Sequence, residues 1–183
     1  MSLRPRSLSV TVAGLALAAA LVPLTGMSAG SAAPAPASGT ATTARAAACA
    51  AADLTVRRGR LEGAAGSRYQ TVRVLNGGDH ACALPGWTRY RFVHRGDAIG
   101  FRSPRNRGYD PARPPVVIPA GGDARSTLSW VDPGPVPAAQ CHARLATAAR
   151  VRLAGVSGAF GLHLHARVCT TEQYRPHGTR LRI

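Results

Sequence analysis

Apolar and polar residues alternate along several short runs of this 183-residue chain. In each run the residues of one parity are apolar, and those of the other are mostly arginine, threonine, serine or histidine. This pattern is typical of β-strands that place one face on a core. The expected inward residues are Leu54, Val56, Val72, Val74, Tyr90, Phe92, Leu128, Trp130, Val151, Leu153, Leu162, Leu164, Ala166, Val168, Leu181 and Ile183. A shift of one residue would turn a row of guanidinium groups inward, so the charges help to fix the register.

Turn-forming residues separate these runs. Clusters rich in Gly, Asn, Asp, Pro or Ser stand at 76–79, 95–97, 119–123 and 155–158, where they break strands. Residues 116–118 lie between prolines and are expected to form a short edge strand. Residues 138–149 have room for a short helical turn. The spacing of runs and turns predicts an all-β, Ig-like two-sheet β-sandwich of about 7–9 short strands.

The first 37 residues have the order of a secretory signal peptide. Two arginines precede an uncharged apolar stretch at 8–24, and small residues follow it. Gly14 and Pro23 interrupt this stretch, which favours a cleaved signal over the alternative, a retained transmembrane anchor. Cleavage is placed after Ala37, which ends an A-x-A pattern, although similar patterns end at residues 32 and 33.

These features divide the chain into a signal peptide at 1–37, an Ala/Thr-rich linker at 38–48 and a β-sandwich domain at 49–183. The linker is too poor in large apolar residues to order itself. No cysteine ends the apolar stretch, so a lipoprotein anchor is not expected. We therefore expect a secreted, extracellular protein, with loose association with the cell envelope as an option. No transmembrane segment is expected in the mature chain.

All four cysteines, Cys49, Cys82, Cys141 and Cys169, lie in the predicted domain. Four cysteines allow three pairings. Sequential pairing, Cys49 with Cys82 and Cys141 with Cys169, is favoured because it ties neighbouring predicted strands together. A zinc site is the alternative. The absence of a C-x-x-C spacing and the predicted export favour two disulfides.

The charge of the chain is strongly one-sided. Its 23 basic residues are all arginine, against eight acidic residues, for a net charge of +15. Without Arg4 and Arg6 the charge is about +13. Codon bias in a GC-rich genome explains the absence of lysine. It does not remove glutamate, so the surplus itself indicates a domain that attracts anionic polymers.

Several phrases of the domain occur together in one known family. They are CAAADL at 49–54, GAAG at 63–66, VRVLNGG at 72–78, CALPGW at 82–87 and VIPAGGDA at 117–124, followed by Trp130 and Cys141. In this order the chain resembles the actinobacterial secreted domain-of-unknown-function 4232 family over nearly all of 49–183. The resemblance implies an exported Ig-like sandwich with two disulfides, often attached to the envelope. It brings no catalytic residues, and the chain departs from the family pattern in its arginine content.

The densest basic segment is the Pro/Gly-rich stretch 102–113. It contains Arg102, Arg105, Arg107 and Arg113, together with Tyr109. Guanidinium groups form paired hydrogen bonds with phosphate or carboxylate, and a tyrosine ring can stack on a ligand. These four arginines are therefore the candidate anion-binding residues. The competing interpretation is a surface loop in an arginine-biased protein.

His163 and His165 are the weak candidates for a metal site. They stand two residues apart on the outward face of one predicted strand, and a metal would need a third ligand. His142, His177 and Asp132 are the residues considered for that place. A solvated strand face is the favoured interpretation, so we expect no bound metal and no other cofactor.

Nothing in the sequence predicts catalysis. The GVSG phrase at 155–158 is similar to a nucleophile elbow, but position 159 is alanine and the phrase lies between two strands, so a turn is favoured. The acidic residues are scattered singly. Trp87 and Trp130 are expected in the core.

We therefore expect a secreted, non-catalytic, envelope-associated binding or structural module. An anionic cell-envelope polymer is the expected partner, with no specific recognition of nucleic acid. The alternatives are an exported protein partner, or a metal-binding protein that uses His163 and His165.

Overall fold

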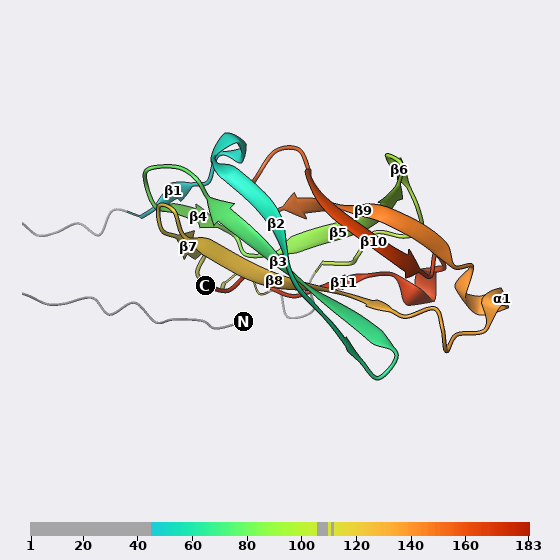
Figure 1. Cartoon of the computed structure of the whole chain (residues 1–183). Helices are drawn as coiled ribbons and strands as arrows, with labels where there is room; N and C mark the ends of the chain where they lie inside the picture. Colours follow the sequence, from blue (N-terminus) through green and yellow to red (C-terminus); the bar gives the residue numbers. More distant parts are fainter. Residues whose placement is uncertain (1–44, 106–109, 111) are drawn as a thin grey trace, which may run out of the picture. The chain divides into compact units, whose positions relative to one another are not determined.

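The computed structural model describes residues 45–105, 110 and 112–183. Two antiparallel four-stranded sheets pack face to face, and a small three-stranded sheet closes one end (Figure 1). Sheet I has the order β11 (His177–Gly178), β8 (Asp123–Val131), β3 (Ser67–Asn76) and β2 (Leu54–Ala64). Sheet II has the order β10 (Phe160–Val168), β9 (Arg144–Leu153), β5 (Thr88–His94) and β6 (Asp97–Ala98). The end sheet consists of β1 (Ala47–Ala48), β4 (Cys82–Leu84) and β7 (Val116–Ile118).

Helical structure is confined to single turns in the described residues. They are η1 (Ala51–Asp53), α1 (Ala138–Cys141) and η2 (Glu172–Tyr174). The predicted all-β sandwich is thus confirmed, as are the edge strand at 116–118 and the turn at 155–158. The described part contains 11 strands, more than predicted. The strands that the alternation did not predict are β1, β4, β6 and β11, since two or three residues are too few to reveal an alternating pattern.

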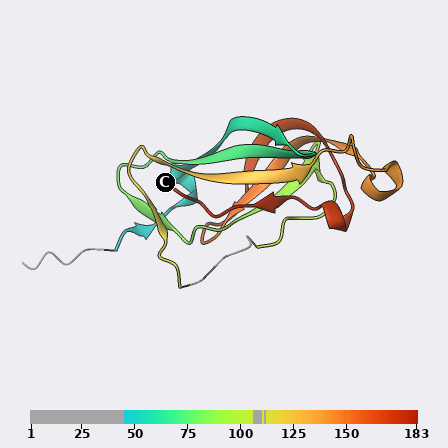
Figure 2. The ribbon, with the colours of Figure 1, turned by 90° about the horizontal axis from the view of Figure 1, so that it is seen from below.

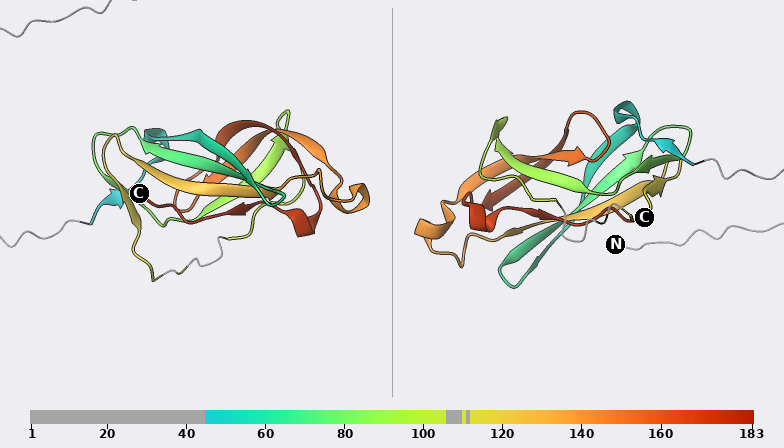
Figure 3. Two further views of the ribbon diagram at one scale, coloured as in Figure 1. Left: turned by 60° about the horizontal axis from the view of Figure 1, so that its bottom comes forward. Right: turned by 180° about the vertical axis from the view of Figure 1, so that it is seen from behind.

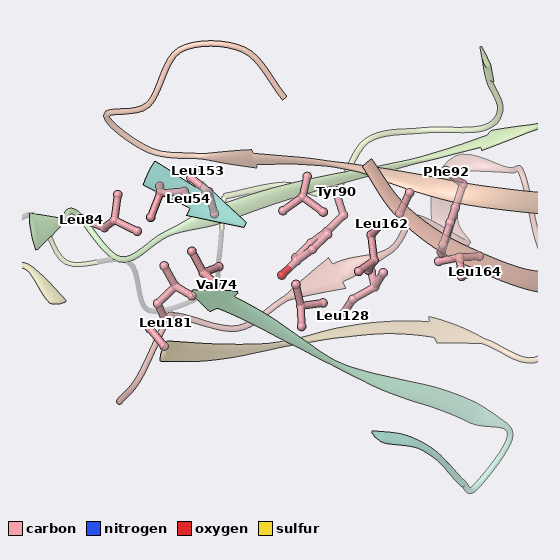
Figure 4. Packing of buried hydrophobic residues seen from close by; sticks show 14 of the residues in the cluster. Leu54, Val74, Leu84, Tyr90, Phe92, Leu128, Leu153, Leu162, Leu164 and Leu181 are labelled. Atoms are coloured by element: carbon pink, nitrogen blue, oxygen red, sulfur yellow. The ribbon is translucent and has the colours of Figure 1, made fainter. Parts of the chain in front are cut away.

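The alternating residues form the core between the sheets. Val74 and Leu128 of sheet I lie opposite Tyr90 and Leu162 of sheet II (Figure 4). All four side chains are buried, while Arg91, between Tyr90 and Phe92, is exposed. The strand parity predicted from the sequence is therefore correct at the centre of the sandwich.

The prediction was wrong for Ile183, whose side chain is 72% exposed. The C-terminal segment pairs with β8 only through β11 and through an isolated bridge from Arg125 to Arg182. Leu181 is buried beside this bridge. Ile183 lies beyond the last pairing, so no neighbouring strand holds its side chain over the core.

The outer strand of sheet I, β2, is irregular in its middle. Its pairing with β3 shifts between Arg58 and Leu61. There the buried Gln70 side chain donates hydrogen bonds from Nε2 to the carbonyl oxygens of Gly59 (2.9 Å) and Arg60 (3.1 Å). These bonds satisfy carbonyl groups that the β-bulge removes from the regular ladder.

Both disulfides have the sequential pairing. Cys49 is bonded to Cys82, and the Cys49 amide donates to the carbonyl of Ala83 (3.1 Å), so this bridge fixes β1 against β4. Cys141, at the end of α1, is bonded to Cys169, just after β10. The described residues include no helix long and apolar enough to cross a membrane.

A tight contact joins β11 to the core, at the edge of the sandwich where the C-terminal segment passes beside β8 (Figure 2). A Cβ atom added to Gly178 would lie 2.6 Å from Cε2 of Tyr90 and 2.9 Å from its Cδ2. The Tyr90 ring is buried and its hydroxyl is hydrogen-bonded to Ser126 Oγ, so it has no room to retreat.

Gly178→Ala should therefore lower the free energy of unfolding by about 1–3 kcal/mol, because overpacking displaces a buried ring. Urea unfolding followed by tryptophan fluorescence measures the loss. Gly161→Ala in β10 is the matched control: nothing lies within 4 Å of its added Cβ, so it should change stability by less than about 0.5 kcal/mol. Equal effects of the two substitutions would contradict this account.

Candidate anion-binding site

Four arginines face one another on the outer side of sheet II. In the β5–β9 pairing Arg89 lies opposite Arg152, and Arg91 lies opposite Arg150. The residues between them, such as Tyr90 and Val151, point into the core, and this alternation turns the arginines outward. Figure 3, in its right panel, brings these strands of sheet II forward. Like charges directly opposite on neighbouring strands destabilise a sheet, so this arrangement has a cost to the fold.

A fifth arginine reaches the same place from the segment that follows β6. The Ile99 amide donates to the carbonyl of Phe92 (2.9 Å), and the Ser103 amide donates to the carbonyl of Tyr90 (2.8 Å). In return, the buried Ser103 side chain accepts a hydrogen bond from the Tyr90 amide (2.8 Å). These bonds fix residues 99–103 along the edge of β5 and place Arg102 beside the strand arginines.

Together these residues form a shallow hollow of about 310 Å³, here called the strand hollow. Its lining residues are Arg89, Tyr90, Arg91, Arg102, Arg150 and Arg152. None of the ion pairs among the described residues involves one of these arginines; their basic partners are Arg60, Arg68, Arg73, His80, Arg125 and Arg175. Arg91 and Arg150 donate to the carbonyls of Gly100 and Gly96. The hollow therefore carries positive charge that no carboxylate neutralises within the described part of the chain.

A tryptophan ring lies at the margin of the strand hollow. The guanidinium carbon of Arg89 lies 5.4 Å from the centroid of the Trp87 ring, and that of Arg105 lies 5.1 Å from it. Both distances are within the range of cation–π attraction. The prediction that Trp87 belongs to the core was wrong, since it is only half-buried. Trp130 is buried, as predicted, and its ring packs edge-on against Phe92.

A second arginine-lined hollow, of about 440 Å³, lies beside the C-terminal segment and is here called the C-terminal hollow. Its lining residues are Pro104, Arg105, Arg113, His177, Gly178, Thr179, Arg180 and Arg182. Arg180 is held in place by donating to the carbonyls of Pro85 (3.3 Å) and Pro114. No Asp or Glu is among the described residues that line either hollow.

The structure thus divides the four arginines predicted from the 102–113 segment. Arg102 lines the strand hollow, whereas Arg105 and Arg113 line the C-terminal hollow. Arg107 and Tyr109 lie outside the described residues. The sequence analysis placed Arg89, Arg91, Arg150 and Arg152 among the outward arginines of several strands but did not single them out as one site. Their outward parity was visible in the alternation, but the pairing of β5 with β9 was not.

The histidines considered for a metal site are not gathered into one. His163 and His165 are exposed on β10. Among the described residues, no group of three or more His, Cys, Asp or Glu side chains could hold a metal ion. Asp132 instead accepts a hydrogen bond from Arg68 (2.7 Å), and His177 lines the C-terminal hollow.

Two arginines of sheet I, Arg73 and Arg125, share a carboxylate partner, in contrast to those of the strand hollow. Asp123 accepts hydrogen bonds from Arg73 (2.7 and 3.1 Å) and from Arg125 (3.1 Å). The hydrogen bonds from Arg73, followed by those from Arg125 and the charges of both groups, lower the pKa of Asp123 from 3.8 to about 2. This cluster is therefore an ion-pair network of the fold, in which one carboxylate offsets part of the charge of two arginines.

Asp123→Asn should destabilise the domain by about 1 kcal/mol at pH 6, because the Asp123 side chain is only 17% exposed and the exposure of its arginine partners limits the effect. A depressed carboxyl pKa adds stability above pH 4, and this contribution is lost as the pH falls toward 2. Urea unfolding at pH 6, 4 and 2 should show the two proteins converging in stability at the lowest pH. A difference that stays constant with pH would contradict the role of this carboxylate.

Comparison with known proteins identifies the family. The family described as Domain of unknown function (DUF4232) matches residues 49–178, and the chain belongs to it. No curated protein and no solved structure matches the chain.

Proposed function

For this member of the DUF4232 family, we propose the function of a secreted, non-catalytic module that binds an anionic polymer of the cell envelope through the strand hollow. The observation that carries the proposal is the direct opposition of Arg89 with Arg152 and of Arg91 with Arg150. Arg102 adds a fifth guanidinium group to the same hollow, and no acidic residue is among its lining residues.

The energetics of this arrangement support binding. Opposed arginines on neighbouring strands repel each other. In the absence of a ligand, no carboxylate lines the strand hollow to offset this repulsion. A bound anion would offset that repulsion, because guanidinium groups form strong, paired hydrogen bonds with anionic oxygens. The repulsion that weakens the free fold would then become part of the affinity for the ligand.

The proposed location rests on two further features. The signal-like order of residues 1–37 favours export, and the two disulfides persist in oxidising compartments. A polymer suits the site better than a small anion, because the five arginines of the strand hollow come from three separate segments. Several anionic groups along one chain can engage several guanidinium groups together.

Binding to soluble anionic polymers across a salt series tests this proposal. The native domain should bind polyphosphate or heparin at about 50 mM salt, and binding should be lost near about 0.5 M, as expected for charge pairing. Arg91→Gln with Arg150→Gln should weaken binding about tenfold or more. The same double variant should unfold at equal or higher urea concentration than the native domain, since it removes a repulsive pair.

The matched control removes the same charge from the other end of sheet II. Arg144 in β9 and Arg167 in β10 are exposed and lie outside the strand hollow. Arg144→Gln with Arg167→Gln should weaken binding less than about threefold. Equal losses from the two double variants would mean that only net charge matters, which would overturn the site. Binding of these polymers that survives 0.5 M salt would contradict charge pairing as its basis.

A further inference from the structure

The two arginine-lined hollows are neighbours, and Trp87 joins them. Arg89 lines the strand hollow and Arg105 lines the C-terminal hollow, and both place their guanidinium carbons over the same Trp87 ring. The two guanidinium carbons can therefore be no further apart than their two distances to that ring combined, 5.4 and 5.1 Å.

The backbone connects the hollows in two further ways. Arg102 of the strand hollow and Arg105 of the C-terminal hollow belong to one short segment, which Ser103 fixes to β5. On the opposite side, the Leu181 amide donates to the carbonyl of Gly86 (2.8 Å), directly before Trp87. The C-terminal segment is thus bonded to the residues that lead into β5.

The arginine content of the hollows favours phosphate over carboxylate. A carboxylate places its two oxygens in one plane, whereas the oxygens of a phosphate point in tetrahedral directions and can meet guanidinium groups from several sides. Five guanidinium groups around about 310 Å³ in the strand hollow exceed what a single carboxylate can accept. Arginine is the residue best suited to such phosphate contacts, because it stays charged and its donors are fixed in a plane.

We propose that one linear, phosphate-bearing chain occupies both hollows at once and passes over Trp87. This inference rests on the proposed function and specifies its ligand. The strand hollow holds one stretch of phosphates, and Arg113, Arg180 and Arg182 hold the next. Once the first stretch is bound, the second binds from a high effective concentration, so affinity rises with chain length without any new kind of contact.

The test compares a short and a long probe on variants of each hollow. Tripolyphosphate is too short to fill both hollows, whereas polyphosphate of about 50 units spans them. Arg113→Gln with Arg182→Gln should leave the affinity for tripolyphosphate within about twofold of native. The same variant should weaken binding of the long chain about tenfold and reduce its salt dependence by about two units of log–log slope, roughly one for each phosphate contact removed. The side chains of Arg113 and Arg182 are exposed, so the variant should fold normally.

The outcomes separate this inference from the function on which it rests. If the native domain binds neither probe, the proposed function fails. If Arg91→Gln with Arg150→Gln weakens both probes while Arg113→Gln with Arg182→Gln weakens neither, the strand hollow acts alone and the two-hollow inference is overturned. The Arg144→Gln with Arg167→Gln variant should leave both probes nearly unaffected, as a control for net charge.

Two further probes identify the chemistry of the chain. Polyglutamate of matched length should bind at least about tenfold more weakly than polyphosphate, and equal binding would overturn the assignment to phosphate. Oligothymidylate distinguishes the source of the phosphate. Binding comparable to that of polyphosphate indicates a phosphodiester-linked polymer, and much weaker binding indicates a polyphosphate chain, with both outcomes supporting phosphate recognition.

Discussion

Replacing both cysteines of either disulfide with alanine should lower the free energy of unfolding by about 3–4 kcal/mol. The two bridges close loops of similar length, with sequence separations of 33 for Cys49–Cys82 and 28 for Cys141–Cys169. In the chain-entropy account, the loss depends on the logarithm of loop length, so the two double variants should be nearly equal. Urea unfolding of the native domain and the two double variants measures both values.

Unequal losses would show that local structure matters more than loop entropy. The Cys141–Cys169 bridge has hydrogen bonds that persist without it: the Thr170 amide donates to the carbonyl of Cys141 (2.9 Å), and Thr170 Oγ1 donates to the carbonyl of His142 (2.8 Å). These bonds hold the two ends together in the folded state only. A loss below about 1 kcal/mol for both variants would contradict a stabilising role for the disulfides.

Asn76→Ala should lower the free energy of unfolding by about 3 kcal/mol, a large effect for one amide group. The Asn76 side chain is buried at the end of β3. Its Nδ2 donates to the carbonyls of His80 (2.8 Å), Ile118 (3.1 Å) and Pro119 (3.1 Å), while its Oδ1 accepts from the Gly78 amide (3.0 Å). Removing the amide leaves the buried carbonyl of Ile118 and three partly buried backbone groups without this partner, and the cost of each adds to the loss.

The neighbouring Asp79 provides the control. Its side chain is exposed and, among the described residues, its one hydrogen bond is to His80. Asp79→Ala should change stability by less than about 0.5 kcal/mol. Chemical denaturation of both variants under identical conditions compares their free energies of unfolding. An Asn76→Ala variant as stable as the Asp79→Ala variant would mean that water replaces the lost amide, and the network would then be unimportant.

Asn76 also illustrates what the sequence could and could not predict. The NGGD cluster correctly indicated a break after the β3 strand, because Asn and Gly favour turns. The burial of Asn76 was not predictable, since it depends on β7 ending nearby and presenting the carbonyls of Ile118 and Pro119. A turn can be predicted because it depends on neighbouring residues. A hydrogen-bond partner 42 residues away cannot, because it depends on the fold.

In the candidate site, too, the sequence predicted the local features but not which distant residues lie together. Strand parity correctly placed Arg89, Arg91, Arg150 and Arg152 on outward faces, because the side chains of a strand alternate. It could not place them together, because alternation does not say which strands are neighbours. Counting arginines along the chain instead selected residues 102–113 as one group. The structure divides that group, since Ser103 binds to β5 while Arg180 binds the carbonyl of Pro114.

The bulged edge of sheet I bears on whether copies of this domain that are bound to one ligand can pair with each other. Arginines at 57, 58 and 60 line the outer strand β2, and its register shifts just after Arg58. Charges and bulges on an edge strand prevent a second molecule from adding to the sheet. Domains bound close together on a polyanionic chain should therefore stay separate and bind reversibly. They should not assemble into fibres through pairing of their edge strands.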